Sequence, residues 1–130
     1  MRAALDLATL ADALAASWGA DTAYERTFDS GNPARGQCYP TARVVQHFFP
    51  ELEIARGWVD TGSARERHFW NMTDEYGWMR RIDLTWQQFP PASVRRGFET
   101  LDRFALGDSP PTVARCEVLL RRVVDCLGCG

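Results

Sequence analysis

Cys38, His68 and Asp83 are the residues of this chain whose types could together carry out acyl transfer. Pro40 follows Cys38 closely, and proline is favoured in the first turn of a helix, so a helix is expected to begin at Cys38. Unpaired N–H groups and the helix dipole at such a position would lower the pKa of a thiol. Cys38 is therefore a candidate nucleophile. The alternative is a small residue buried at the start of a core helix.

His68 is the candidate base, because the chain has only two histidines. The other, His47, follows Cys38 on the same expected helix by more than two turns and points to its opposite side. It is interpreted as a surface or core residue. His68 opens a strand of an expected hairpin. If the hairpin turn centres on residues 75–76, His68 lies directly opposite Asp83 on the neighbouring strand, within hydrogen-bond reach.

Asp83 would orient the imidazole of His68 and stabilise the imidazolium that forms when His68 takes the thiol proton. The alternative is an exposed cross-strand ion pair, which contributes less than about 1 kcal/mol to stability. A slip of one residue in the pairing would place the two side chains on opposite faces of the sheet.

Three neighbours of these residues are tentative substrate-positioning groups. Gln37 precedes Cys38 and could bring an amide donor close to a developing oxyanion. Trp70 is expected to pack, and could shield the histidine–aspartate pair from water. Asn71 is expected to face the other side of its strand from His68 by alternation, and is structural by default.

The elements that must position these residues follow from periodicity and turn signals. Leucines at helical spacing predict a helix over 7–18, ended by Gly19. Residues 20–36 lack periodicity, and a connection of that length inside a domain is usually functional. A second helix is expected from Cys38 to before Pro50. Strands are expected near 52–59, 67–73 and 78–85, with a tight turn over 74–77. The last helix should begin near Thr112, and its apolar face should hold Val113, Cys116, Leu120, Val123 and Leu127.

Length and composition bound the class of protein. With 130 residues, a net charge of −2 and 45% apolar residues, the chain fits one ordinary domain over 1–130. Near-neutral charge argues against nucleic-acid binding. No apolar run approaches the roughly 20 residues of a membrane span. Asp6 and Asp12 interrupt the N-terminal apolar pattern, which argues against a signal peptide and for a cytoplasmic location. The oligomeric state is not indicated.

Two further groups of residues have functional and ordinary interpretations. Cys126 and Cys129 have the spacing of half a metal site, but zinc needs about four ligands and no second pair is close in sequence, so no metal or organic cofactor is expected. The arginines at 65, 67, 80 and 81 suggest a solvated sheet edge, or attraction of a carboxylate- or phosphate-bearing substrate.

Several short blocks of the sequence, in one order, carry a family resemblance. They are Asn32-Pro33-Ala34-Arg35-Gly36-Gln37-Cys38, Thr41-Ala42 with Val44-Val45-Gln46, His68-Phe69-Trp70-Asn71, and Asp83-Leu84-Thr85-Trp86-Gln87-Gln88-Phe89. These blocks resemble the YunG-like family of small bacterial proteins. The order Cys, His, Asp is also similar to the transglutaminase-like and NlpC/P60 branch of papain-like enzymes.

The second resemblance implies a papain-like α+β fold in which the helix carrying the cysteine packs on a small antiparallel sheet. It maps the nucleophile, base and acid to Cys38, His68 and Asp83. The expected function is a cysteine-dependent acyl-transfer enzyme without a cofactor, acting on a small-molecule or peptide/protein acyl substrate. Hydrolysis, deamidation and transfer stay open. The alternative is a non-catalytic binding module that retains the fold.

Overall fold

The structure is a computed structural model that describes residues 5–75 and 78–128. Its elements follow the chain as α1 (Leu7–Ser17), η1 (Tyr24–Arg26), α2 (Cys38–Phe48), β1 (Glu53–Asp60), β2 (Arg65–Glu75), β3 (Trp78–Ile82), η2 (Trp86–Gln88), β4 (Val94–Thr100) and α3 (Pro110–Gly128). The fold is α+β, as expected. Among the described residues, no helix combines the length and apolar character needed to cross a membrane.

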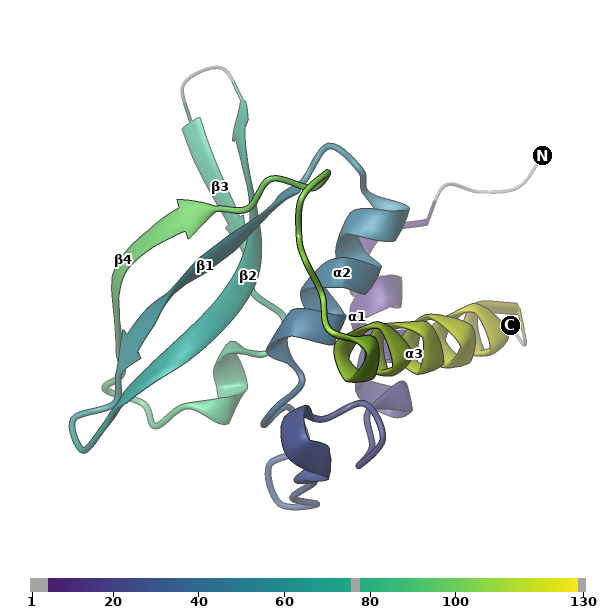
Figure 1. Cartoon of the computed structure of the whole chain (residues 1–130), viewed down its shortest axis with the longest axis horizontal. Coiled ribbons are helices and arrows are strands. Elements are labelled where there is room, and N and C mark those ends of the chain that lie inside the picture. Colours follow the sequence, from purple (N-terminus) through teal and green to yellow (C-terminus); the bar gives the residue numbers. More distant parts are fainter. Residues whose placement is uncertain (1–4, 76–77, 129–130) are drawn as a thin grey trace.

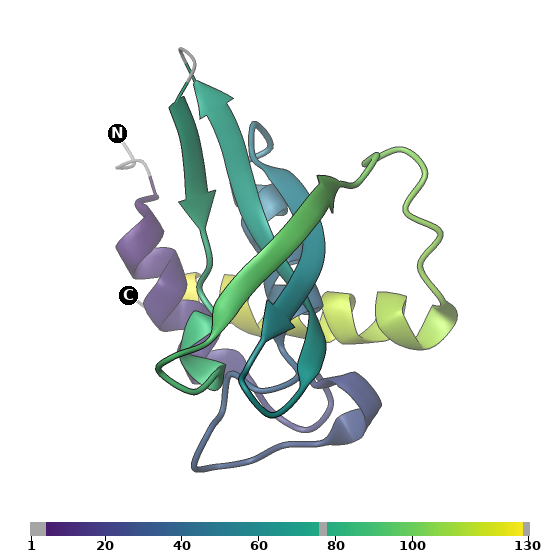
Figure 2. The ribbon, with the colours of Figure 1, turned by 90° about the vertical axis from the view of Figure 1, so that its left-hand side faces the viewer.

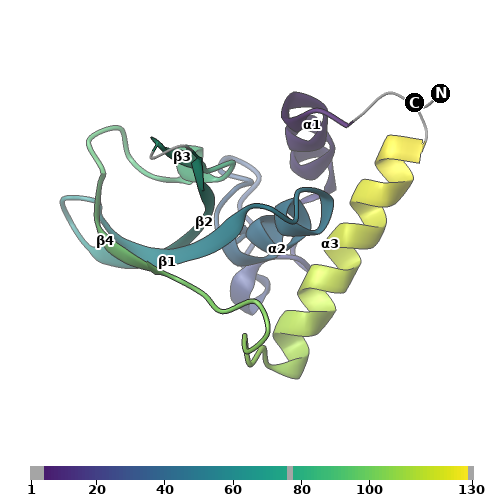
Figure 3. The same cartoon turned by 90° about the horizontal axis from the view of Figure 1, so that it is seen from above.

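The four strands form one antiparallel sheet in the order β3-β2-β1-β4. The sheet curls, and the helices lie against its outer side with α2 between the sheet and α3 (Figures 1 and 3). Figure 2 shows β4 crossing over β1, and the connection from its end looping away from the sheet before it enters α3. Strand β1 lies at the centre because it pairs with both β2 and β4.

Two apolar clusters hold these layers together. The larger one joins the three helices to the sheet through Leu10, Ala13, Leu14, Val44, Val45, Leu52, Ile82, Leu119 and Val123. The smaller one lies on the other face of the sheet and contains Ala55, Trp70 and Met72. The helix layer is therefore fixed to one face of the sheet, and aromatic residues fill the inside of the curl.

The predicted helices and the first two strands are confirmed within a few residues, and α2 begins at Cys38 as expected. The third strand ends at Ile82, three residues earlier than predicted. Strand β4 was not predicted, because most of its residues are exposed and show no clear alternation. On α3, Leu119 and Val123 are buried, whereas Val113 is 40% exposed, so the predicted apolar face is partly wrong. The predicted turn over 74–77 includes residues 76–77, which lie outside the described residues.

The predicted register of the hairpin is wrong by two residues. Asn71 pairs with Ile82, whereas a partner of His68 at Asp83 would have required Asn71 to pair with Arg80. An even shift leaves every side chain on the same face of the sheet. The side chain of Asp83 therefore still reaches the face on which His68 lies, from a position just beyond the end of β3.

Strand β2 presents alternate residues to its two faces. Asn71 donates a hydrogen bond to the carbonyl of Ala42 in α2, and the ring of Phe69 packs edge-on against Tyr39 of α2. These two residues face the helices. His68 and Trp70 consequently point to the inner side of the curl.

Candidate active site

His68 and Asp83 form a buried hydrogen-bonded pair. The Nε2 atom of His68 lies 2.7 Å from Oδ2 of Asp83, and the side chains are 0% and 5% exposed. The carboxylate accepts this hydrogen bond, so Nε2 is the donor. In a neutral imidazole the lone pair then lies on Nδ1. That atom is buried and has no hydrogen-bond partner in the part of the chain that is described.

Asp83 is held from three sides. Nη2 of Arg95 donates to the same Oδ2 at 2.6 Å, and the backbone N–H of Thr85 donates to Oδ1 at 3.3 Å. Burial alone would raise the pKa of Asp83, but the hydrogen bonds from His68 and Arg95 and the charge of Arg95 outweigh it. The pKa of Asp83 is therefore lower than its ordinary value. Arg95 was missed by the sequence analysis because it lies on the unpredicted strand β4.

Aromatic rings enclose the pair. The imidazole of His68 lies 4.8 Å from the ring of Phe89, 5.7 Å from Trp70 and 6.0 Å from Trp86, between ring centres. The guanidinium of Arg95 stacks over Trp86 at 3.8 Å. The rings exclude water from the ion pair, which strengthens its electrostatic interactions. Trp70 thus packs against His68, and Phe89 and Trp86 add contacts that the sequence analysis did not assign.

Cys38 is half-buried at the first residue of α2. Burial raises the pKa of its thiol to about 11, although the backbone N–H groups of Phe69, Tyr39 and Cys38 itself act in the opposite direction. The expectation of a lowered pKa at the helix start is therefore wrong. The physical reason is desolvation, to which the nearby negative charge of Asp83 adds. The resting thiol is neutral.

The thiol of Cys38 lies against the backbone of strand β2 at Phe69, next to His68, and not against the imidazole ring of His68. The backbone N–H of Phe69 approaches the sulfur. Strand β3 pairs with β2 only from Asn71 onward, which leaves the edge at Phe69 open to α2. No hydrogen bond joins the sulfur to His68 among the described residues. The three residues predicted to converge are thus neighbours, and among the described residues the hydrogen bond made between their side chains is that of His68 with Asp83.

A cavity of about 800 Å³ opens at Cys38. One wall comes from strands β1 and β2, and the other comes from the connection between β4 and α3 and from the first turns of α3. The loop before α2 closes one end, where Gly36 turns the chain with φ of 79°. Cys38 and Phe69 line this cavity, whereas His68 and Asp83 are not among its lining residues.

Comparison with protein families matches the chain to the YunG protein family over residues 6–128. The chain belongs to the YunG protein family. No curated protein and no solved structure matches it.

In this YunG family member, Gln37 and Asn71 make structural contacts. The carboxamide of Gln37 is completely buried, accepts a hydrogen bond from Thr22 at 2.7 Å and donates one to the carbonyl of Gly19 at 3.0 Å. These two hydrogen bonds fix the loop before α2, and the tentative role of Gln37 at an oxyanion stays a prediction. Asn71 is also buried, and its bond to Ala42 at 3.0 Å fastens α2 to the sheet.

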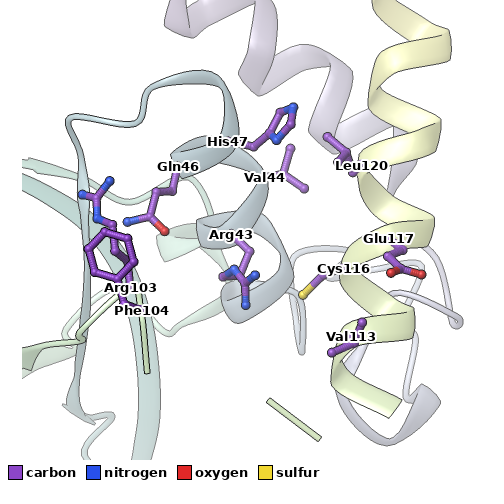
Figure 4. A pocket seen from close by; sticks show the side chains of 10 residues that line it. All are labelled: Arg43, Val44, Gln46, His47, Arg103, Phe104, Val113, Cys116, Glu117 and Leu120. Atoms are coloured by element: carbon purple, nitrogen blue, oxygen red, sulfur yellow. The ribbon is translucent and has the colours of Figure 1, made fainter. Parts of the chain in front are cut away.

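His47 and Cys116 lie away from Cys38, at a second cavity of about 390 Å³ between α2 and α3 (Figure 4). His47 is exposed near the end of α2, as expected for a surface residue. Cys116 is half-buried, and burial raises the pKa of its thiol to about 11. Cys126 is exposed, and Cys129 lies outside the described residues. Within residues 5–75 and 78–128, no three potential metal ligands cluster.

Proposed function

We propose that this protein is a cysteine-dependent acyl-transfer enzyme with a papain-like arrangement of Cys38, His68 and Asp83. The observation that carries the proposal is the buried pair of His68 and Asp83, together with the Nδ1 atom of His68, which lacks a partner within the described part of the chain. Buried polar atoms in folded proteins are almost always satisfied, and an exception calls for an explanation. A site for a proton is such an explanation.

The papain-like comparison is supported by the order of the elements. Helix α2 begins with Cys38 and packs on the antiparallel sheet, mainly against β2, which carries His68. Asp83 follows the next strand, β3. The backbone N–H group of Phe69, the neighbour of His68, approaches the thiol and favours its ionised form. The proposal requires the imidazole of His68 to turn so that Nδ1 reaches the sulfur, since catalytic hydrogen bonds are often long or poorly aligned in the absence of substrate.

The chemistry follows from the protonation states. Sγ of Cys38 attacks the carbonyl carbon of the acyl substrate while its proton passes to Nδ1 of His68, and the carbonyl π electrons move to oxygen. The N–H of Cys38 at the helix start can stabilise that oxyanion. The carbonyl re-forms as the leaving group departs with the proton from His68, which gives a thioester on Cys38. Water or an amine then releases the acyl group by the same steps in reverse.

Asp83 sustains this cycle by staying ionised. Its lowered pKa keeps a negative charge beside Nε2, which holds the tautomer with a free Nδ1 and stabilises the imidazolium. Because the resting thiol is neutral, the proton must move during the attack, and His68 acts as a general base.

Acylation by p-nitrophenyl acetate tests the proposal. We expect intact-mass and peptide analysis to locate an acetyl group on Cys38, and Cys38→Ala to abolish it. His68→Ala should slow acylation by about 10²- to 10⁴-fold, the usual contribution of a general base. Cys116→Ala serves as a matched control and should leave the rate unchanged. An unmodified Cys38, or an unchanged rate in a folded His68→Ala protein, would overturn the proposal.

A non-catalytic binding module is the second candidate. It is favoured by the raised pKa of Cys38 and by the lack of a bond from its thiol to His68 among the described residues. In that case the ion pair would serve only stability, and p-nitrophenyl acetate would label the exposed Cys126 in preference to Cys38.

A further inference from the structure

The cavity at Cys38 has an aromatic floor and charged walls. Tyr39 and Phe69 form an aromatic floor next to the thiol, with ring centres 4.8 Å apart. Tyr24, 61% exposed, stands at the rim. This part can hold an apolar or planar segment of a ligand. The charges of the cavity are carried by its two walls.

Most of the ionised groups on these walls neutralise one another. Arg35 pairs with Glu66 at 3.3 Å. Arg56 pairs with Glu99 on the adjacent strand. Asp108 accepts hydrogen bonds from Arg43 and from Tyr39. Such groups have no charge left for a ligand without breaking an existing pair.

Two arginines on the walls differ from the others. Arg67 of β2 stacks on Trp58 at 4.3 Å, and Arg115 of α3 stacks on Tyr24 at 5.7 Å and donates to the hydroxyl of Thr112 at 2.9 Å. Neither has a carboxylate partner among the described residues. Stacking fixes each guanidinium while leaving donors available, which suits recognition of an oxyanion.

The remaining acid on the wall is Asp102, in the connection after β4. Its Oδ1 accepts the backbone N–H of Phe104 at 2.9 Å. Asp102 carries one negative charge, against the two positive charges of Arg67 and Arg115. The groups without an ion-pair partner on the walls therefore give a positive balance on the approach to Cys38.

We propose that this cavity binds an acyl substrate bearing an anionic group, a carboxylate or a phosphate, which pairs with Arg67 and Arg115 while the acyl carbonyl reaches Cys38. The inference rests on the proposed acyl-transfer function and specifies its substrate class. The two arginines lie on opposing walls, so the anion binds between the sheet and α3.

Two thiol reagents that differ in charge test this proposal. Methanethiosulfonates carrying a sulfonatoethyl or a trimethylammonioethyl group form mixed disulfides with Cys38, and peptide mass analysis separates that product from those of the other cysteines. At low ionic strength the anionic reagent should react faster at Cys38 than the cationic one. Added salt should reduce this preference by screening.

Variants of the two arginines test whether these residues cause the preference for the anionic reagent. Arg67→Gln and Arg115→Gln should each reduce the anionic-to-cationic rate ratio by about two- to fivefold, the range expected for loss of one exposed charge interaction. The matched controls are Arg65→Gln on the same strand and Arg121→Gln on the same helix, which do not line the cavity. These should leave the ratio unchanged.

The outcomes separate this inference from the proposed function. Equal rates for the two reagents, a preference that survives in the double variant, or no reaction at Cys38 with either reagent would overturn the anionic substrate class. The acetyl-transfer test with His68→Ala addresses the chemistry alone. A charge preference without acylation would retain an anion-binding cavity and remove the enzyme.

To distinguish the sources of the anion, glutarate and inorganic phosphate can be compared as protecting ligands. Protection of Cys38 by glutarate alone assigns a carboxylate, and protection by phosphate alone assigns a phosphate. Protection by either should disappear in the double arginine variant. Protection that persists in that variant would contradict the assignment of the site to Arg67 and Arg115.

Discussion

Replacing Asp83 with asparagine removes one charge from the buried pair with almost no change in shape. The amide oxygen of asparagine can take the place of Oδ2, which accepts from both Nε2 of His68 and Nη2 of Arg95. Its NH2 group would then face the backbone N–H of Thr85, which donates to Oδ1 in the wild type, and no negative charge would remain beside Arg95. The substitution therefore leaves a guanidinium without its counter-ion inside an aromatic enclosure.

The expected cost follows from burial. Asp83 is 5% exposed and His68 is completely buried, and removal of one partner of a buried ion pair typically costs about 3–5 kcal/mol. The side chain of Arg95 is 20% exposed and can turn towards water, so the lower end of the range applies. We expect Asp83→Asn to lower the free energy of unfolding by about 3 kcal/mol.

Urea denaturation followed by far-ultraviolet circular dichroism measures this loss. Asp21→Asn is the matched control, because Asp21 pairs with Arg122 at the surface with both side chains about two-fifths exposed. Its cost should stay below about 1 kcal/mol. Combining Asp83→Asn with Arg95→Met should cost less than the sum of the single changes, because the unpaired guanidinium is gone.

The pH dependence of the unfolding free energy is a second measurement, and the direction of the expected change follows from the pKa of Asp83. The pKa of Asp83 in the folded protein is below its ordinary value of 3.8. The ionised carboxylate therefore makes its full contribution to the free energy of unfolding at pH values above the pKa of Asp83 in the unfolded chain. That contribution is lost as the pH falls through the pKa of Asp83 in the folded protein. The part of the stability difference between the wild type and Asp83→Asn that comes from the Asp83 carboxylate should shrink below about pH 4. A loss no larger than that of Asp21→Asn, or a difference that does not shrink below about pH 4, would contradict this prediction.

Three further predictions concern the framework of the site. Gly57→Ala should lower the unfolding free energy by about 1–3 kcal/mol, because the added Cβ would lie 2.4 Å from the carbonyl oxygen of Gly97. Asn71→Ala should cost about 1–3 kcal/mol in the same assay, since it leaves the buried carbonyl of Ala42 without its side-chain donor. Alkylation of Cys38 by iodoacetamide should accelerate with pH from about 7 to about 10 without a plateau, because the pKa of the thiol is raised to about 11.

Each of these predictions has a contrary outcome. Gly128→Ala, where the new Cβ meets nothing within 4 Å, should change stability by less than about 0.5 kcal/mol, so an equal effect at Gly57 would contradict the steric argument. A loss below about 0.5 kcal/mol for Asn71→Ala would show that the bond to α2 contributes little. A rate plateau for Cys38 below about pH 9 would indicate a thiolate that its surroundings stabilise.

Much of the site could be predicted from local patterns. The placement of Pro40 predicted the start of α2 at Cys38, because proline at that point fits only the first turn of a helix. Strand alternation placed Asn71 on the opposite face from His68. The contact between His68 and Asp83 was predicted with the wrong register, and it survives because a shift of two residues keeps the same face.

Local sequence specifies the reactive residue types and the elements that carry them, since helix caps and periodicity are properties of neighbouring residues. The tertiary structure alone decided the surroundings of each group. Strand β4 joins the sheet by pairing with β1 far back in the chain, and this brings Arg95 onto Asp83. The packing of α2 against β2 removes much of the water around Cys38 and reverses the expected direction of the shift in its pKa. Both effects depend on contacts between distant segments, and local sequence patterns do not encode such contacts.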